Sequence, residues 1–149
     1  MLIEERFRVG APIQSVWDFL MDPEKLGSCI PGCEKVTSLD ERNYLASVKA
    51  AVGPISLKFN IHTEILELNP PFNLRSVSKG EDNGKRGKVR QETIVEFIKI
   101  SENETEVCYK SEVTVAGKLA TFGFAIMRAK VKELSQKFAN SVKEKLEKN

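Results

Sequence analysis

The periodicity of apolar residues changes once along this sequence, near residue 118, and the change limits the folds available to the chain. Before it, apolar and polar residues alternate in several segments, which is typical of β-strands with one buried face. After it, apolar residues recur at spacings of three and four, which predicts one amphipathic helix of about 28 residues, long enough at ~1.5 Å per residue to span a small domain. An antiparallel sheet with one apolar face needs a cover, and only this helix is long enough to supply it.

The predicted elements follow one another as a strand, two short helices, six strands and the long helix. Asp22 followed by Pro23 is a start signal for the second short helix, and Gly27 is expected to end it. Leu66 interrupts the clearest alternation, which predicts a β-bulge. The strands are expected at about 2–9, 34–39, 44–52, 55–65, 72–79, 88–100 and 104–116, and the short helices at about 12–20 and 23–28. This order predicts an α+β fold in a single domain, residues 1–149, with a curved seven-stranded antiparallel sheet wrapped around the C-terminal helix.

Length and composition are those of an ordinary globular domain. The 149 residues are 41% apolar and 30% charged, and the formal net charge of +2 is too small to indicate nucleic acid binding. The three cysteines are few and odd in number, which favours a reducing compartment over a disulfide framework. The sequence shows neither a secretory signal nor an apolar run of about 20 residues, so we expect a cytoplasmic protein.

The inward faces of the last three strands before the helix carry small and polar residues where large apolar ones would fill a core. Ser76 follows Leu74, Gln91 and Thr93 follow Val89, and Ser111 follows Tyr109 on the same faces. Such residues leave space between sheet and helix, and an apolar space with a few polar groups is typical of a small-molecule site. The alternative is that these positions lie at strand ends or bulges and face water. A slip of one residue in register would also turn each of them outward.

The predicted ligand-binding residues are those expected to line this space. They come from the short helices, from the inward faces of the strands and from the start of the long helix. They are Leu20, Leu26, Ile30, Tyr44, Ala46, Val48, Phe59, Ile61, Leu74, Ser76, Gln91, Thr93, Tyr109, Ser111, Leu119, Phe122, Phe124, Met127 and Val131.

No catalytic group or metal site can be assembled from the sequence. His62 is the only histidine, and its register places it on the solvent face, so Ser–His or Cys–His catalysis lacks a base. Glu5 has an inward register and is either an acid with a perturbed pKa or, the favoured alternative, a side chain that reaches water at the sheet edge. Tyr109 is better suited to orienting a ligand than to catalysis. Cys29 and Cys33 are separated by three residues, whereas typical zinc or redox pairs are separated by two, so small buried hydrophobes are the favoured interpretation.

Two further segments have both a functional and a structural interpretation. Basic residues cluster at a glycine-flanked hairpin tip, predicted at Glu81 to Gly87, and would form either a soluble turn or a contact for an acidic partner or anionic lipid. These contact residues are Lys85, Arg86, Lys88 and Arg90. The segment from Gly117 to Gly123 leads into the long helix, either as a mobile apolar gate beside the pocket or as a site of close packing at Gly123.

One family resemblance covers essentially the whole sequence. The segment from Val16 to Pro23 (Val-Trp-Asp-Phe-Leu-Met-Asp-Pro), then Leu26, then Cys29-Ile-Pro-Gly-Cys33, resembles the N-terminal signature of CoxG, a family of carbon monoxide dehydrogenase subunits. This family is a branch of the START-like, or SRPBCC, helix-grip superfamily. The segment Gly117 to Gly123 resembles that family's approach to its last helix. The resemblance implies the helix-grip fold, with the Cys29–Cys33 segment capping one mouth of the cavity.

The resemblance also implies a function. It indicates a non-enzymatic carrier that holds a quinone-like or isoprenoid ligand and links a molybdenum-containing carbon monoxide dehydrogenase, or a related hydroxylase, to the membrane or to quinone. An assembly factor without a ligand and an enzyme of the polyketide cyclase type are the alternatives. Many relatives extend beyond the last helix into a segment that can anchor to membrane, whereas this sequence ends at Asn149. We therefore expect a soluble shuttle whose contact with the membrane is peripheral and transient.

Overall fold

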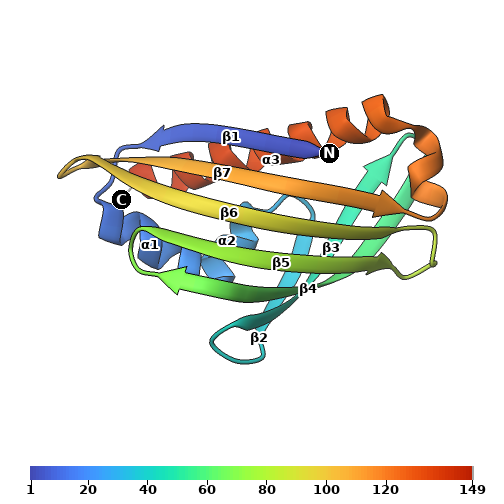
Figure 1. Cartoon of the computed structure of the whole chain (residues 1–149), viewed down its shortest axis with the longest axis horizontal. Helices are drawn as coiled ribbons and strands as arrows, with labels where there is room; N and C mark the ends of the chain where they lie inside the picture. Colours follow the sequence, from blue (N-terminus) through green and yellow to red (C-terminus); the bar gives the residue numbers. More distant parts are fainter. Residues whose placement is uncertain (149) are drawn as a thin grey trace.

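A computed structural model describes residues 1–148 and contains one curved antiparallel sheet with its helices on the concave side (Figure 1). The strand order is β1-β7-β6-β5-β4-β3-β2, so β1 and β2 are the sheet edges. The elements are β1 (Leu2–Val9), α1 (Ile13–Met21), α2 (Pro23–Cys29), β2 (Cys33–Ser38), β3 (Asn43–Val52), β4 (Ile55–Asn69), β5 (Asn73–Asp82), β6 (Lys88–Ser101), β7 (Glu104–Ala116), the 3-10 helix η1 (Lys118–Phe122) and α3 (Phe124–Glu147). The predicted fold class is confirmed.

The α1–α2 connection is built from the residues that the sequence singled out. The Asp22 carboxylate accepts hydrogen bonds from the backbone amides of Glu24 and Lys25, at 3.0 and 3.3 Å, and Pro23 occupies the first turn. Gly27 does not end α2, which continues to Cys29. It is buried instead, and a Cβ there would lie 2.6 Å from Cγ2 of Val36, so glycine lets α2 lie directly on β2.

The long helix begins later than predicted. Helical periodicity starts near residue 118, but residues 118–122 form a separate 3-10 helix, and α3 begins at Phe124. Gly117 and Gly123 adopt φ of 80° and 91°, a region that favours glycine and that interrupts an α-helix. A Cβ on Gly123 would meet nothing within 4 Å, so the predicted alternative of close packing at this residue is wrong.

The predicted inward register of the strands is confirmed. Ser76 of β5 lies opposite Thr93 of β6, and Thr93 lies opposite Ser111 of β7, so all three share the concave face. The predicted bulge is present, because the β4–β5 register shifts between Ile65 and Glu67. The β5–β6 turn is shorter than predicted, since β5 extends to Asp82.

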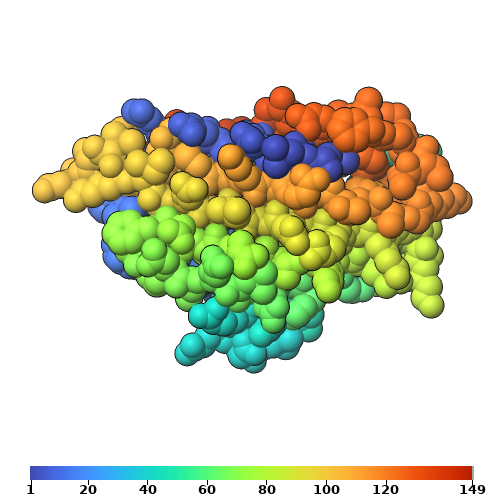
Figure 2. All heavy atoms as spheres, viewed as in Figure 1, coloured from blue at the N-terminus to red at the C-terminus, as the bar shows by residue number. Residues whose placement is uncertain are grey.

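The apolar core is divided between the two ends of the sheet. One buried cluster joins α1, α2 and the end of α3 to β6 and β7, and includes Val16, Trp17, Phe97 and Val142. The other lies near η1 and includes Val52, Leu57, Phe59, Leu119 and Met127. The outer face of the sheet is covered only by its own side chains, and α3 shows along the β1 edge (Figure 2).

Candidate functional site

A belt of polar side chains crosses the concave face of the sheet between the two apolar clusters. One row contains Thr63, Ser78 and Gln91, and the hydroxyls of Thr63 and Ser78 are 2.6 Å apart. In the next row, the Ser111 hydroxyl accepts a hydrogen bond from Gln91 Nε2 at 2.9 Å and lies 3.0 Å from the Thr93 hydroxyl. The belt replaces the apolar layer that would otherwise join the two clusters.

The centre of the concave face is not sealed by the helix. Tyr44, Ala46, Ser76 and Gln91 all face inward but are only half-buried. Helix α3 packs mainly against β1, with further contacts to α2 and η1. We name this half-buried part of the concave face, between the polar belt and α3, the central hollow. Its walls keep partial contact with solvent, as expected where packing is incomplete.

The structure places the predicted ligand-binding residues in three groups. The half-buried ones that face the concave side or its rim are Leu20, Leu26, Ile30, Tyr44, Ala46, Val48, Ile61, Leu74, Ser76, Gln91, Thr93, Phe122 and Val131. The buried ones are Phe59, Tyr109, Ser111, Leu119 and Met127. Phe124 alone is exposed.

Two of these predictions need correction. Phe124, the first residue of α3, is 64% exposed, so it does not line the central hollow. Ser111 is only 1% exposed and is enclosed by Gln91 and Thr93, so it holds the belt together and presents no free surface to a ligand. Thr63 and Ser78 belong to the belt but are not among the predicted site residues. The alternation of their strands already indicates their inward register.

Tyr109 is held in its protonated form. Burial raises its pKa to about 12, the Ser135 side chain acts in the opposite direction, and the nearby Glu5 carboxylate raises it further. The Tyr109 hydroxyl donates a hydrogen bond to the Ser135 carbonyl at 3.1 Å. Its ring also meets Phe138 edge-on at 6.3 Å. A tyrosine with this pKa, whose hydroxyl already donates a hydrogen bond to the backbone, is a poor general base or acid.

Glu5 is half-buried, so it agrees only in part with the favoured expectation that it reaches water. It faces inward opposite Tyr109 in the β1–β7 register. Its Oε1 is buried and accepts no hydrogen bond from the described residues. Glu5 also lines a cleft of about 380 Å³ between β1 and α3, together with Arg128 and Lys132.

The other reactive side chains do not form a catalytic group. His62 is exposed on the outer face, as predicted, with its Nε2 3.0 Å from Asn43 Oδ1. Cys29, Cys33 and Cys108 are free thiols, and burial raises the pKa of both Cys33 and Cys108. Within residues 1–148, no three His, Cys, Asp or Glu side chains come together as a metal-binding group.

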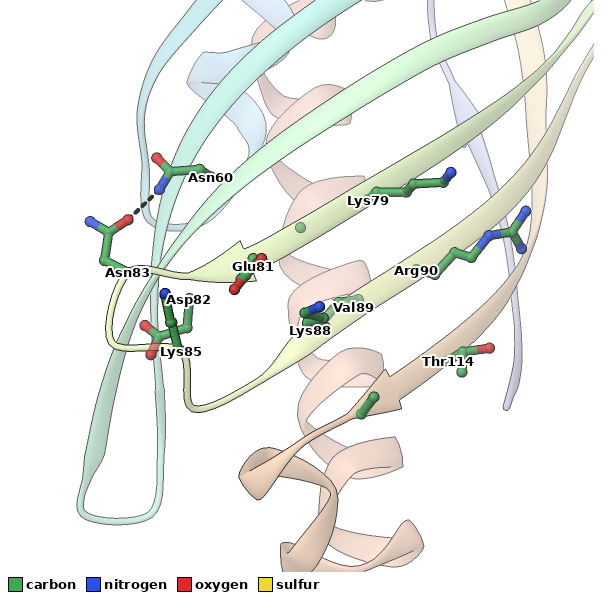
Figure 3. A pocket seen from close by; sticks show the side chains of 12 residues that line it. Asn60, Lys79, Glu81, Asp82, Asn83, Lys85, Lys88, Val89, Arg90 and Thr114 are labelled. Carbon is green, nitrogen blue, oxygen red and sulfur yellow. Dashed lines mark hydrogen bonds between the residues drawn. The ribbon is translucent and has the colours of Figure 1, made fainter.

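A larger depression, of about 770 Å³, lies on the outer face of the sheet near the β5–β6 turn (Figure 3). Lys79, Lys85, Lys88 and Arg90 line it, so three of the four predicted basic contact residues meet there. Arg90 forms an ion pair with Glu92 at 2.9 Å. The depression is open and lies mainly on the face opposite the polar belt, so it is not the predicted cavity.

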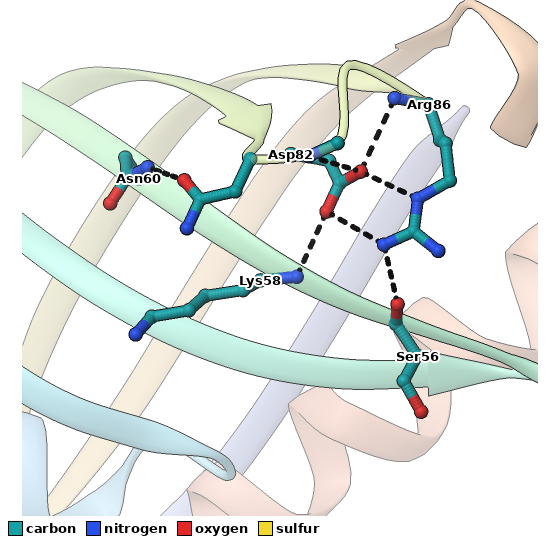
Figure 4. A network of polar contacts seen from close by, with 7 residues as sticks. Ser56, Lys58, Asn60, Asp82 and Arg86 are labelled. Carbon is teal, nitrogen blue, oxygen red and sulfur yellow. Dashed lines mark hydrogen bonds and ion pairs between the residues drawn. The ribbon is translucent and has the colours of Figure 1, made fainter.

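Arg86, the fourth predicted contact residue, forms hydrogen bonds within the protein (Figure 4). Its Nε donates to the buried Asp82 carboxylate at 2.9 Å, and its Nη2 donates to the Ser56 carbonyl at 2.6 Å. Asp82 also accepts from the backbone amide of Lys58, at 3.0 Å. These bonds, that of Arg86 foremost, hold the pKa of Asp82 well below its usual range. Arg86 therefore stabilises the β5–β6 turn, and its role as a contact residue stays a prediction.

Several solved structures resemble this chain along most of its length. A conserved protein from Geobacillus kaustophilus has a TM-score of 0.91 at 24% identity, covering 99% of this chain and 96% of that chain. A START superfamily protein from Mycobacterium smegmatis has a TM-score of 0.78 at 12% identity, covering 99% and 97%. The Zhui aromatase/cyclase from Streptomyces sp. R1128 has a TM-score of 0.74 at 16% identity, covering 99% and 94%. A comparison with curated proteins finds no match.

These likenesses establish a START-like fold for the chain. In residues 1–148, no helix combines the length and the apolar character that crossing a bilayer requires. The model of the CoxG family of carbon monoxide dehydrogenase subunits matches residues 6–147. Because that match spans nearly the entire sequence, the chain belongs to the CoxG family.

Proposed function

We propose that this protein binds and carries a lipophilic small molecule in the central hollow, without itself catalysing a reaction. The observation that carries the proposal is the divided core, in which a half-exposed polar belt separates two buried apolar clusters. A ligand with apolar ends and a polar group between them would bury its ends against the clusters and satisfy the belt. Tyr109 and the thiols offer no acid, base or activated nucleophile in support of an enzyme.

Membership of the CoxG family supports a finer form of the proposal. The ligand would be a quinone or another isoprenoid lipophile, and the protein partner a molybdenum-containing carbon monoxide dehydrogenase or a related hydroxylase. The carrier would link that enzyme to membrane quinone. The alternatives are an assembly factor that binds no ligand and an enzyme resembling an aromatase/cyclase.

The surface beside η1 suits transient contact with a membrane. The β5–β6 turn and η1 are adjacent, since the amide of Leu119 donates to the Arg86 carbonyl at 2.8 Å. Lys85 and Lys88 are exposed in this region, and Phe124 and Ile126 expose apolar side chains at the start of α3. Basic and apolar side chains together favour the surface of an anionic bilayer. Sedimentation with anionic and with neutral vesicles tests this contact, and equal binding to both would contradict a role for the lysines.

The carrier function is tested by ligand recovery and by filling the central hollow. Protein purified from its native host and extracted with organic solvent should yield a lipophile that mass spectrometry identifies. Ala46→Phe should fold normally but take up that lipophile at least about tenfold more weakly, because the larger side chain occupies space at a half-buried, inward position. Leu45→Phe is the matched control, since Leu45 is exposed on the opposite face.

Unchanged uptake by Ala46→Phe would place the ligand elsewhere. Persistent failure to recover or bind any lipophile would favour the assembly factor. Turnover of a polyketide-like substrate would favour the enzyme.

A further inference from the structure

One oxygen of the half-buried Glu5 carboxylate is a shielded hydrogen-bond acceptor without a partner among residues 1–148. The inward residues of β1 on either side of it, Ile3 and Phe7, are buried or half-buried, whereas the outward residues Glu4 and Arg6 are exposed. Oε1 of Glu5 is shielded from solvent and has no partner among residues 1–148. Leaving a buried carboxylate oxygen without a donor is destabilising, so this arrangement calls for an explanation.

Two of the groups near Glu5 donate hydrogen bonds elsewhere. Tyr109, directly opposite in the β1–β7 register, donates its proton to the Ser135 carbonyl. Arg128 lines the same cleft but donates to the Leu2 carbonyl at 2.8 Å. Lys132 also lines the cleft, and among the described residues no donor is bonded to Oε1 of Glu5. Oε1 is therefore available to a donor from outside the chain.

Glu5 is also placed to meet a ligand. It faces Tyr109, which is two residues from Ser111 on the same face of β7, while Ile3 lies opposite Ser111 itself, so Glu5 is one row away from the polar belt. The adjoining cleft between β1 and α3 opens beside Glu5.

We propose that Glu5 accepts a hydrogen bond from a hydroxyl group of the bound ligand, so that the protein holds a hydroxyl-bearing aromatic lipophile, such as a phenol or hydroquinone, in preference to its carbonyl or ether counterpart. This inference rests on the proposed carrier function. An ionised carboxylate only accepts hydrogen bonds, so it attracts an O–H group and repels a carbonyl or ether oxygen. For a quinone ligand, the reduced hydroquinone would be the form that is held.

The test uses two probes that differ in a single hydroxyl, 2-naphthol and 2-methoxynaphthalene, titrated by calorimetry. The wild-type protein should bind 2-naphthol about tenfold or more tightly than the methyl ether, as expected for a hydrogen bond to a charged acceptor. Glu5→Gln should narrow this ratio to about twofold, because a neutral amide accepts more weakly and can also donate to the ether oxygen. Glu4→Gln is the matched control, since Glu4 faces outward on the same strand, and it should leave the ratio unchanged.

A second variant separates binding from stability. Glu5→Leu removes the unfilled acceptor, so the ligand-free variant should melt at a higher temperature than the wild type, while its naphthol preference disappears. Equal affinities of the wild type for the two probes, or an unchanged ratio in Glu5→Gln, would overturn the role of Glu5 and leave the carrier function standing. Binding of neither probe, nor of any other lipophile, would remove the carrier function and this inference with it.

Discussion

Replacing Gly27 by alanine tests how closely α2 is held against β2. A Cβ at this position would lie 2.6 Å from Cγ2 of Val36, and a β-branched side chain has little rotamer freedom to withdraw. Overpacking of this kind costs about 1–3 kcal/mol, whereas alanine within a helix is favoured over glycine by about 1 kcal/mol. Gly27→Ala should therefore lower the free energy of unfolding by about 1 kcal/mol. Urea unfolding followed by the fluorescence of Trp17, the only tryptophan, measures the change.

Gly27→Ala should have the opposite effect on the free energy of unfolding when Val36 is shortened. In a Val36→Ala background the clash is absent and only the helix preference remains, so Gly27→Ala should stabilise by about 1 kcal/mol. The coupling energy of this double-mutant cycle should then be about 1–3 kcal/mol. Gly10→Ala is the control, because its Cβ would meet its nearest neighbour at 3.6 Å, an ordinary contact. A coupling energy below about 0.5 kcal/mol would refute the argument that Gly27 is needed for the close approach of α2 to β2.

The remaining predictions concern charge and packing at opposite ends of the sheet. The pKa of Asp82 is lowered by folding, so its contribution to stability is fully present above its ordinary value of 3.8 and is lost as the pH falls through the lower folded value. Asp82→Asn should therefore be less stable than the wild type at neutral pH and should lose less stability on acidification. Urea midpoints of both proteins, measured in steps below about pH 5, test this. Midpoints that fall in parallel with pH would contradict this expectation. Trp17 is buried, and its ring meets that of Phe97 edge-on at a centroid distance of 5.4 Å. Trp17→Ala should therefore lower the free energy of unfolding by about 3–5 kcal/mol, measured by urea unfolding followed by circular dichroism. A loss below about 1 kcal/mol would contradict its place in the core.

Alternation of apolar residues is sufficient to predict the sheet and its inward face. Period-two patterns alone place Ile61, Ser76 and Thr93 on the concave side, and their cross-strand pairing agrees. A pattern of this kind is reliable because a slip of one residue would expose the entire apolar set of a strand.

The sequence is less informative where a single long-range contact decides the outcome. Helical spacing continues through Gly123, so the break before Phe124 depends on backbone conformations that side-chain patterns do not record. Arg86 resembles its basic neighbours in sequence, and only the fold brings the buried carboxylate of Asp82 beside it. The enclosure of Ser111 depends on hydrogen bonds from β6, and no local pattern contains them.

The choice between carrier and enzyme depends on what the interior groups can do with a proton. The START-like fold is shared with an aromatase/cyclase, so the fold itself decides nothing. Acid–base catalysis needs a group whose pKa lies near the operating pH, and Tyr109 is shifted away from it, to about 12, with its proton already donated to Ser135. In the proposed carrier, Glu5 orients a hydroxyl of the ligand and exchanges no proton with it. A polar belt that binds but does not exchange protons is what a carrier requires, since the ligand must leave unchanged.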